Sequence, residues 1–543
     1  MGPDNPEHWD WSADADQRWW IDRIKGEVSH WEAFSNSPPW FQTVSGYVSG
    51  GFDASADQIR ADRVDDFATY LVRVSEHVER THGIRFDTID PLNEPNTNYW
   101  GTQLGPDGRP TGGRQEGAHA GPALQQSVIL ALRKALDASA LDARLSAVDE
   151  TSPTLFRTNW NAYGDEGQAA VDQLNVHTYG TGHRTSARDI AKGADKPLWM
   201  SEVDGTWGSG QSFTSVEPGL GIAQRIVDDM RELEPSAWLL WQAVEDHNPQ
   251  AAAGKNWGAI QIPFDCPSNA TPTTCPIRTN TKFNTIRNFT HFVRPGDHVV
   301  KVDNTSGLAA VSANGTSATV VHVNDTTEPR AVTLDLSRFG TVHVNAPVMP
   351  VVSDANGALV RGKPVRIEAD RSATLTVPAK SVTTFVIHGV RGVAPDAALV
   401  RSGHAYALDG VQSGKALVPS PDGSSVVLGT TDQADANAWW RIEQVTSGTG
   451  NRERYAVRHD SGKRLADRGG SLVLEPGTQT DSAAQGIMST TGDGSYTFVN
   501  ASTGRLLDVV GQGTGVGTRV GVHAANSGTN QRWTVVDRTP HTS

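Results

Sequence analysis

The sequence has only two cysteines among 543 residues, no apolar run of about 18 residues or more, and no stripe of lysine and arginine. The missing apolar run excludes a membrane-spanning helix. The missing basic stripe, together with a net charge of −14, argues against nucleic acid or an anionic membrane surface as a partner. The 37% hydrophobic and 20% charged residues are typical of a globular protein. The length predicts two to four domains, because one core rarely serves so many residues.

Motifs of several enzyme classes are also missing. No Gly-x-Ser-x-Gly elbow follows a predicted strand, which argues against a Ser-His-Asp hydrolase. No phosphate loop or dinucleotide fingerprint stands in the required context. The cysteines are too few for a metal site of their own. We therefore expect no metal and no organic cofactor.

The two cysteines, Cys266 and Cys275, lie in one loop rich in proline, threonine and asparagine. A short loop closed by a disulfide is typical of an extracellular protein, so we predict a disulfide and a secreted protein; two free thiols are the alternative. Residues 1–6 lack the basic and apolar segments of a signal peptide. These two observations together predict that an N-terminal part of the protein precedes Met1.

Residues 1–291 alternate between strand-like and helix-like stretches, and polar residues follow the strand-like runs. This is the pattern of a (β/α)8 TIM barrel. Helical patterns cover residues 14–25, 57–81 and 121–138. Six strands can be counted, at residues 31–34, 84–89, 145–148, 174–177, 198–200 and 237–241. Because the barrel needs eight strands, we expect the first two to lie upstream of Met1.

The rest of the chain is predicted to be all-β. In residues 292–390 valine and threonine alternate with polar residues between turns such as Asn314-Gly315, which predicts a β-sandwich side domain. Residues 396–538 contain three copies of a turn–strand unit, at residues 413–417, 461–465 and 503–507. Units of about forty residues are too small to fold alone, so three of them predict a fold with pseudo-threefold symmetry.

Two of the predicted barrel strands are followed by a glutamate. Glu94 stands in Pro91-Leu-Asn-Glu-Pro95, and Glu202 follows Trp199-Met-Ser. Carboxylates from one end of a barrel fit retaining glycoside hydrolysis, in which one protonates the leaving oxygen and the other attacks the sugar. As the acid, Glu94 needs a pKa raised by partial burial; as the nucleophile, Glu202 needs donors that keep it ionised. The alternatives are a surface carboxylate for Glu94 and an arginine-paired structural carboxylate for Glu202.

Further candidates for substrate binding lie near the predicted strand ends. His177 and Tyr179 end the strand before Glu202 and could orient the nucleophile or bind a sugar hydroxyl. Glu150 could be a third acidic group, but we favour a hydrogen-bond acceptor for the substrate. Trp241 could form the floor under a sugar ring, because aromatic faces stack on sugars, although core packing is the alternative. The remaining candidates are Asn93, Asn36, Trp40 and Trp100.

The motifs at residues 33–40, 91–101, 113–117, 174–180 and 198–205 resemble glycoside hydrolase family 30, and within it the bacterial endo-β-1,6-galactanase branch. The resemblance covers about residues 1–390. It implies a catalytic barrel fused to a β-sandwich, with Glu94 after Asn93 as acid/base and Glu202 as nucleophile. Family members begin with a side-domain strand and two further barrel strands, the second with an arginine near the site. This sequence departs from the family at that point.

The repeats of residues 396–538 resemble a ricin-type β-trefoil lectin. In that family an Asp early in a repeat, an aromatic residue and an Asn-Gln pair bind a galactose-type sugar. The third repeat keeps this set, with His523 in the place of the aromatic residue: Asp508, His523, Asn530 and Gln531. The first repeat has Val418 and Ala438 in place of the Asp and Gln, and the second has Ala466 in place of the Asp. We therefore predict one sugar site; a purely structural trefoil is the alternative.

These observations predict a secreted, monomeric multidomain protein whose partner is a polysaccharide. Its domains are a TIM barrel without its first two strands (residues 1–291), a β-sandwich (292–390) and a β-trefoil (396–538). The predicted activity is cleavage of the β-1,6-galactan side chains of arabinogalactan. One alternative is a catalytically inactive, truncated carbohydrate-binding protein. Another is a β-1,6-glucanase or xylanase of the same family, since a fold by itself does not decide the substrate.

Overall fold

The computed structural model of the chain describes residues 5–111, 113–208, 210, 212–431, 435–445 and 452–539. Residues 1–4, where the sequence shows no signal-peptide pattern, lie outside this described part. The chain divides into a first compact unit of Met1–Ala187, Asp195–Glu202 and Pro235–Trp238 and a second of Arg188–Ala194, Val203–Glu234 and Leu239–Ser543. All helices of the described residues are too short or too polar to cross a bilayer.

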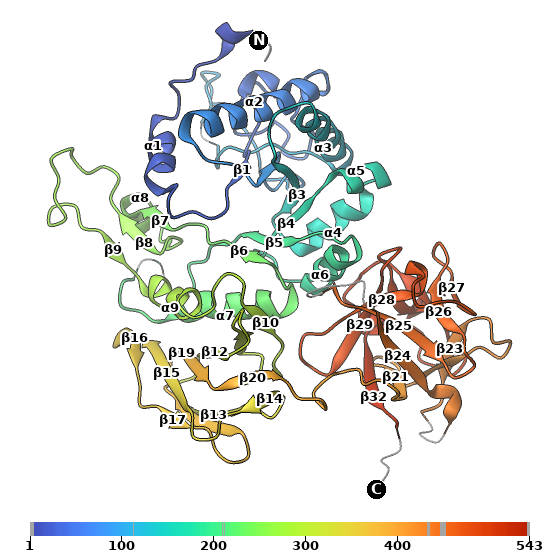
Figure 1. Cartoon of the computed structure of the whole chain (residues 1–543). Coiled ribbons are helices and arrows are strands. Elements are labelled where there is room, and N and C mark those ends of the chain that lie inside the picture. The colour runs from blue at the N-terminus through green and yellow to red at the C-terminus, as the bar shows by residue number, and fades with distance from the viewer. Residues whose placement is uncertain are drawn as a thin grey trace. The chain divides into compact units, whose positions relative to one another are not determined.

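The first unit is built on a six-stranded sheet whose strands lie side by side in chain order (Figure 1). All neighbours pair in parallel; Ile89, for example, pairs with Ala33 on one side and Leu145 on the other. The strands are β1 (Glu32–Phe34), β2 (Thr88–Asp90), β3 (Arg144–Glu150), β4 (Gln173–His177), β5 (Leu198–Glu202) and β6 (Ala237–Trp238). Each overlaps a predicted strand. The parallel strand–helix arrangement confirms the TIM-like part of the predicted fold class.

Helices precede and connect these strands in the chain: α1 (Ala15–Ile24), α2 (Val64–His82), α3 (Pro122–Asp137), α4 (Pro153–Ala162), α5 (Asp165–Ala170), α6 (Arg184–Gly193) and α7 (Glu217–Glu232). In α2 the residues Phe67, Leu71 and Ser75 are buried at a spacing of four, so they form one inward face. The helix ends at Gly83, whose φ of +67° is a left-handed cap. The prediction that this helix begins at residue 57 was wrong, because residues 61–63 form a 3-10 turn, η3 (Ala61–Arg63), before it.

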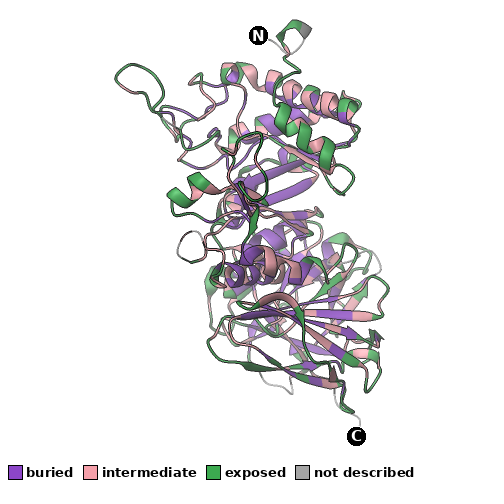
Figure 2. Ribbon diagram, turned by 90° about the vertical axis from the view of Figure 1, so that its left-hand side faces the viewer, coloured by how far each residue is buried: buried purple, intermediate pink, exposed green. Residues whose placement is uncertain are grey.

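The strands of the parallel sheet are mostly buried (Figure 2), yet one face of them is polar. Since side chains alternate along a strand, Asn175 and His177 of β4 point to the same side. The Asn175 amide donates to Glu32 of β1 at 3.0 Å and to Asp90 of β2 at 2.9 Å. The hydroxyl of Ser146 in β3 donates to Glu32 at 2.8 Å. His177 therefore continues a polar interior at the carboxyl end of β4.

The second unit continues with a small sheet of β7 (Val244–Asp246), β8 (Ile260–Ile262) and β9 (Arg278–Thr279), with the helices α8 (His247–Ala252) and α9 (Thr281–Thr290). Cys266 and Cys275 form a disulfide in the loop between β8 and β9. This confirms the predicted disulfide, which joins two cysteines nine positions apart in the sequence.

The next part of the second unit is antiparallel. One sheet has the order β10 (His298–Val300), β11 (Gly307–Val311), β12 (Ser317–Asn324), β19 (Ser381–His388), β15 (Pro347–Asp354) and β16 (Gly357–Arg361), with β17 (Val365–Arg366) beside β15. Two strand pairs accompany it, β13 (Arg330–Asp335) with β18 (Ser372–Val377) and β14 (Phe339–Val342) with β20 (Val390–Val393). Leu334 and Leu375 from the first pair share a buried core with Val348 and Phe385 of the large sheet, as in a sandwich.

The last part of the second unit is a twelve-stranded sheet. Its strands are β21 (Tyr406–Gly410), β22 (Ala416–Pro419), β23 (Val426–Gly429), β24 (Trp440–Val445), β25 (Arg454–His459), β26 (Arg464–Asp467), β27 (Leu472–Glu475), β28 (Gln485–Ser489), β29 (Ser495–Asn500), β30 (Leu506–Val509), β31 (Arg519–His523) and β32 (Trp533–Asp537). Each repeated unit ends in the first strand of an equivalent hairpin, β22–β23, β26–β27 or β30–β31. Leu417, Leu465 and Leu507, one from each repeat, enter a common core. This confirms the predicted trefoil. The three domain boundaries stay a prediction.

Candidate active site

Glu94 lies in the loop after β2, and its backbone is held from both sides. Its φ of +46° is left-handed, which is uncommon for a residue with a side chain. Its N–H donates to the carbonyl of Asp149 at 2.9 Å. Its own carbonyl accepts bonds from the Trp100 indole and the Thr97 hydroxyl, both at 2.9 Å. A strained but fully bonded backbone of this kind is typical of functional sites.

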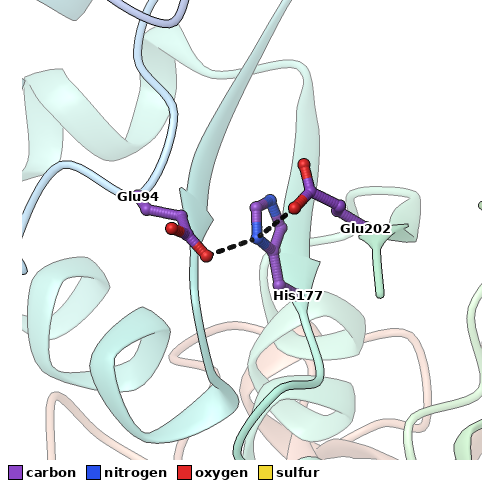
Figure 3. Close-up of side chains that lie close together, drawn as sticks. All are labelled: Glu94, His177 and Glu202. Atoms are coloured by element: carbon purple, nitrogen blue, oxygen red, sulfur yellow. Dashed lines mark hydrogen bonds and ion pairs between the residues drawn. The ribbon is translucent and has the colours of Figure 1, made fainter. Parts of the chain in front are cut away.

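The structure brings Glu94, His177 and Glu202 together (Figure 3). Nδ1 of His177 lies 3.1 Å from Oε1 of Glu94 and 3.9 Å from Oε1 of Glu202. One oxygen from each carboxylate and this nitrogen all lie within 4.8 Å of one another. Each carboxylate also accepts a hydrogen bond from a tyrosine hydroxyl. Tyr99 donates to Glu94, and Tyr179 donates to Glu202 at 2.7 Å. Retaining hydrolysis needs carboxyl groups about 5–5.5 Å apart and inversion about 6.5–9.5 Å, so this spacing fits retention.

Asp149 completes the group. Nε2 of His177 lies 3.1 Å from Oδ1 of Asp149, which also accepts the Ser201 hydroxyl at 2.6 Å. The imidazole is 1% exposed and has a carboxylate at each nitrogen. Burial by itself would lower the pKa of His177, but the carboxylates of Asp149, Glu94 and Glu202 raise it well above its ordinary value. A pKa raised in this way favours an imidazolium, which can donate from both nitrogens.

The two glutamates have different pKa values. Burial would raise the pKa of Glu94, but hydrogen bonds from His177 and Tyr99 and the charge of His177 hold it below its ordinary value. Burial raises the pKa of Glu202 to about 7 against the opposing effects of His177 and the Tyr179 hydrogen bond. These directions are the reverse of those predicted from the sequence. The reason is the position of His177, which is hydrogen-bonded to Glu94 but 3.9 Å from Glu202.

Two predicted substrate contacts have internal partners instead. Glu150 is fully buried and accepts from the Asn96 N–H at 2.8 Å and from the Asn159 amide, and burial raises its pKa to about 8. Trp100 is 1% exposed, and its ring nitrogen holds the backbone of Glu94. The prediction that these two residues contact the substrate was wrong, because both side chains are buried and no face of them is left for a sugar. Both act as supports of the site.

The other candidates are less closely defined. Asn93 is 3% exposed, and its side-chain oxygen has no hydrogen-bond partner among the described residues. Asn36 is half-buried after β1. Trp40 begins η2 (Trp40–Gln42) and is 54% exposed, as a stacking platform must be. Trp241 belongs to the second unit, three residues beyond the end of β6. Substrate binding by all four stays a prediction.

Three residues at the site, Asp149, Ser201 and Arg114, were not predicted from the sequence. Asp149 stands beside Glu150 at the end of β3, and a strand-end carboxylate two strands from Glu202 was the available signal. Arg114 is exposed, and its guanidinium carbon lies 4.4 Å from the ring centre of Tyr99, the phenol that donates to Glu94. A contact of this kind between a cation and an aromatic face leaves no trace in local sequence.

The same three side chains have the composition of a metal site. Glu94, His177 and Glu202 each offer a ligand atom within 4.8 Å of the others. A metal would need an unprotonated nitrogen of His177, but Nδ1 is hydrogen-bonded to Glu94 and Nε2 to Asp149. The donor set therefore fits a protonated histidine between carboxylates, and we do not assign these residues as metal ligands.

In the trefoil the predicted sugar-binding residues of the third repeat lie together. Asp508 is 5% exposed, and its Oδ2 accepts the amides of Asn530 at 2.7 Å and Gln531 at 2.9 Å. His523 is exposed, and its charge acts on Asp508. Burial raises the pKa of Asp508 although the Gln531 bond and His523 oppose it. The amides fix the carboxylate through Oδ2, and sugar binding by this group stays a prediction.

Comparisons with known proteins agree with this architecture. Residues 4–173 match the model of the family described as O-Glycosyl hydrolase family 30, and residues 485–542 match that of ricin-type beta-trefoil lectin domain-like proteins. The chain is 31% identical to an exo-beta-1,6-galactobiohydrolase of Bifidobacterium longum subsp. longum, over 99% of this chain and 42% of that protein. It is 27% identical to an endo-beta-1,6-galactanase of Hypocrea rufa, over 64% of this chain and 66% of that protein.

A solved structure shares the fold. The catalytic domain of GH30 xylanase C from Talaromyces cellulolyticus has a TM-score of 0.52 at 19% identity, over 70% of this chain and 81% of that chain. Fold and paired carboxylates thus place the protein in the structural class of barrel-type glycoside hydrolases. The chain belongs to glycoside hydrolase family 30 and carries a C-terminal ricin-type β-trefoil domain. It spans 42% of the Bifidobacterium relative's length and 66% of the Hypocrea relative's.

Proposed function

We propose that the protein is a secreted, retaining glycoside hydrolase that cleaves β-1,6-galactan and holds galactose-rich substrate through its trefoil. The observation that carries the proposal is the separation of no more than 4.8 Å between one oxygen of Glu94 and one of Glu202. The names of the two sequence relatives support the substrate. The disulfide between Cys266 and Cys275 supports an extracellular setting.

The chemistry would proceed in two steps. The Glu202 carboxylate attacks the anomeric carbon while Glu94 gives its proton to the leaving glycosidic oxygen, so an ester to Glu202 forms and the glycosidic bond breaks. Glu94 then takes a proton from a water molecule, which attacks the same carbon and releases Glu202. Tyr179, hydrogen-bonded to Oε1 of Glu202, would steady the nucleophile through both steps.

The pair of carboxylates needs one shared proton for this chemistry. In the substrate-free site the higher pKa belongs to Glu202, so the proton rests there and must pass to Glu94 when substrate binds. Two interacting carboxyls titrate as a pair, and the pair rather than one residue holds the proton. A leaving oxygen beside Glu94 would displace donors from that carboxyl and raise its proton affinity.

The pH dependence of kcat/KM follows from this pair. Above about pH 7, where the pair loses its proton, we expect kcat/KM to fall tenfold per pH unit, because no general acid remains. At a pH below the ordinary range of a glutamate, Glu94, whose pKa is held below its usual value, also becomes protonated and the pair has no nucleophile. Initial rates between pH 4 and 9 on a soluble galactooligosaccharide check this. A rate that stays constant up to pH 9 would contradict a shared proton.

A panel of polysaccharides tests the substrate. We expect reducing ends to appear from β-1,6-galactan and not from β-1,6-glucan or xylan. Galactobiose as the sole product would indicate release from chain ends, and a ladder of products internal cleavage. Release from glucan or xylan alone would overturn the substrate proposal. No release from any of the three would favour the alternative of an inactive carbohydrate-binding protein.

The trefoil site gives a separate prediction. Asp508→Ala should weaken galactose binding by about 10–100-fold, because a buried charged acceptor is worth about 1.5–3 kcal/mol and Asn530 and Gln531 lose their partner. Calorimetry with galactose measures this. The matched control is Asp460→Ala, which removes a 41%-exposed carboxylate of the second repeat. Equal binding by both variants would indicate a purely structural trefoil. Hydrolysis of a short soluble substrate should not change, since tethering alters only local concentration.

A further inference from the structure

We propose that Asp149 is a positioning residue that acts on Glu94 in two ways, through its backbone carbonyl and, by way of His177, through its carboxylate. The inference rests on the proposed function only for its effect on hydrolysis. Its structural part concerns the state of a buried histidine. In the sequence Asp149 stands beside Glu150, and both are carboxylates at the end of one strand, so the sequence does not distinguish their roles.

The backbone link joins two residues in unusual conformations. Asp149 has a φ of +49° and Glu94 a φ of +46°. The Glu94 N–H donates to the Asp149 carbonyl at 2.9 Å, so each loop holds the other in place. Such backbones are energetically unfavourable for residues with side chains and persist only where neighbours fix them. The direction of the Glu94 side chain thus depends on the end of β3.

The side-chain link passes through His177. Oδ1 of Asp149 accepts Nε2–H of His177 at 3.1 Å and the hydroxyl of Ser201 at 2.6 Å. The opposite nitrogen, Nδ1, lies 3.1 Å from Oε1 of Glu94. Asp149 is 4% exposed, so its charge is little screened by solvent. A carboxylate on Nε2 favours the doubly protonated ring, which then presents an N–H to Glu94.

The charged and titratable groups around His177 come from several elements. Glu94 follows β2, Asp149 and Glu150 end β3, and Glu202 ends β5. Tyr179, just after β4, meets the imidazole edge at 5.9 Å between ring centres. Of the carboxylates, only Asp149 and Glu94 are hydrogen-bonded to the ring. Glu94 must gain and lose a proton during turnover, so of the two carboxylates hydrogen-bonded to His177, Asp149 is the one with no part in the proton transfer.

Replacement of Asp149 should reverse this arrangement. In Asp149→Asn the Ser201 hydroxyl still needs an acceptor, so the amide oxygen stays toward Ser201 and Nε2 of His177. His177 loses the charge that favours its second proton, and its pKa falls. A neutral imidazole no longer holds the proton affinity of Glu94 down, so the pKa of Glu94 rises. The midpoint for His177 should fall by about 1–3 pH units, the usual effect of one close opposite charge.

Side-chain NMR of the ¹⁵N-labelled full chain tests the proposal without any need for turnover. We expect the titration midpoint of His177, assigned with a His177→Gln variant, to lie well above that of an ordinary histidine in the wild type. It should lie lower in Asp149→Asn. Ser201→Ala is the matched control, because it removes the other bond to Oδ1 and keeps the charge. A His177 that stays protonated in Asp149→Asn as in Ser201→Ala would overturn the proposal.

A second variant covers the case that Asp149→Asn does not fold. In Glu94→Gln the charge of Asp149 remains, so His177 should still be doubly protonated. If His177 loses its second proton in Glu94→Gln, then Glu94 rather than Asp149 stabilises that proton, and the proposal is overturned. In kinetics, Asp149→Asn should shift the acidic limb of kcat/KM to higher pH, whereas a merely structural role would lower the whole profile. Normal NMR behaviour with no hydrolysis of galactan would sink the proposed function and leave this inference intact.

Discussion

Glu202→Ala is expected to abolish hydrolysis, and added azide to restore it with a product of inverted configuration. Without the carboxylate no glycosyl ester forms, and kcat should fall by at least about 10⁴-fold. Azide then enters the space that the side chain leaves and attacks the anomeric carbon directly. A β-galactoside with a good leaving group should therefore give the α-galactosyl azide, which NMR of the product identifies.

Glu94→Ala should give the opposite product. With a good leaving group the ester to Glu202 still forms, but no base remains to activate water, so turnover should fall by about 10²–10⁴-fold. Azide needs no base and attacks the ester from the face of the leaving group, which yields the β-galactosyl azide. Glu166→Gln, a change at an exposed carboxylate of α5, is the control and should leave the rate unchanged.

These two variants decide which glutamate is the nucleophile and which is the acid/base, because the pKa values do not. In the substrate-free site Glu94 is the more acidic of the two and Glu202 has a pKa of about 7. If the roles were exchanged, the two azide products would be exchanged as well. The α-azide from Glu94→Ala would therefore overturn the assignment, while the separation of the two carboxylates would still fit retention.

The second large effect is on stability. Glu234→Gln should lower the free energy of unfolding of the second unit by about 3–5 kcal/mol, because it leaves buried cations without their carboxylate. Glu234 lies 2.6 Å from Lys192 and 2.9 Å from Lys301, and it is 12% exposed. Arg188, 2% exposed, lies 3.8 Å away. The urea midpoint, followed by tryptophan fluorescence, measures the loss.

The pH dependence of this cluster has a defined sign. Burial would raise the pKa of Glu234, but Lys192, Lys301 and Arg188 lower it to about 2. A carboxyl with a depressed pKa stabilises the fold fully above its unfolded value of 4.5 and loses this contribution as the pH falls toward 2. The stability difference between wild type and Glu234→Gln should therefore shrink over that range. A constant difference would contradict the ion-pair explanation.

An exposed ion pair of the same unit provides the control. Glu217 lies 3.0 Å from Lys380, and the two side chains are 51% and 34% exposed. Exposed pairs contribute about 0–1 kcal/mol, since solvent screens them and ordering two long side chains costs entropy. Glu217→Gln should therefore shift the midpoint little. Similar losses in both variants would show that charge burial is not the cause.

Local sequence was enough to find the two glutamates and the fold class. An apolar run followed by Asn93-Glu94 or Ser201-Glu202 marks a strand end, and hydrophobic periodicity is a property of neighbouring residues. The repeats at residues 413–417, 461–465 and 503–507 indicated the trefoil in the same way. Element bounds were less accurate, as at the start of α2, because turns compete locally with helix.

The sequence by itself determined which elements form and which side chains stand at their ends, since alternation and spacing are encoded within a few residues. Only the tertiary structure decided which of those side chains meet. It placed Asp149, and not Glu150, in hydrogen-bonding contact with the His177 ring. It buried Trp100, whose indole donates to the Glu94 carbonyl, and it gave Glu202 the higher pKa of the two glutamates. The physical reason is that burial and electrostatic fields act through space, between residues that are more than fifty positions apart in the chain, such as Glu94 and Asp149.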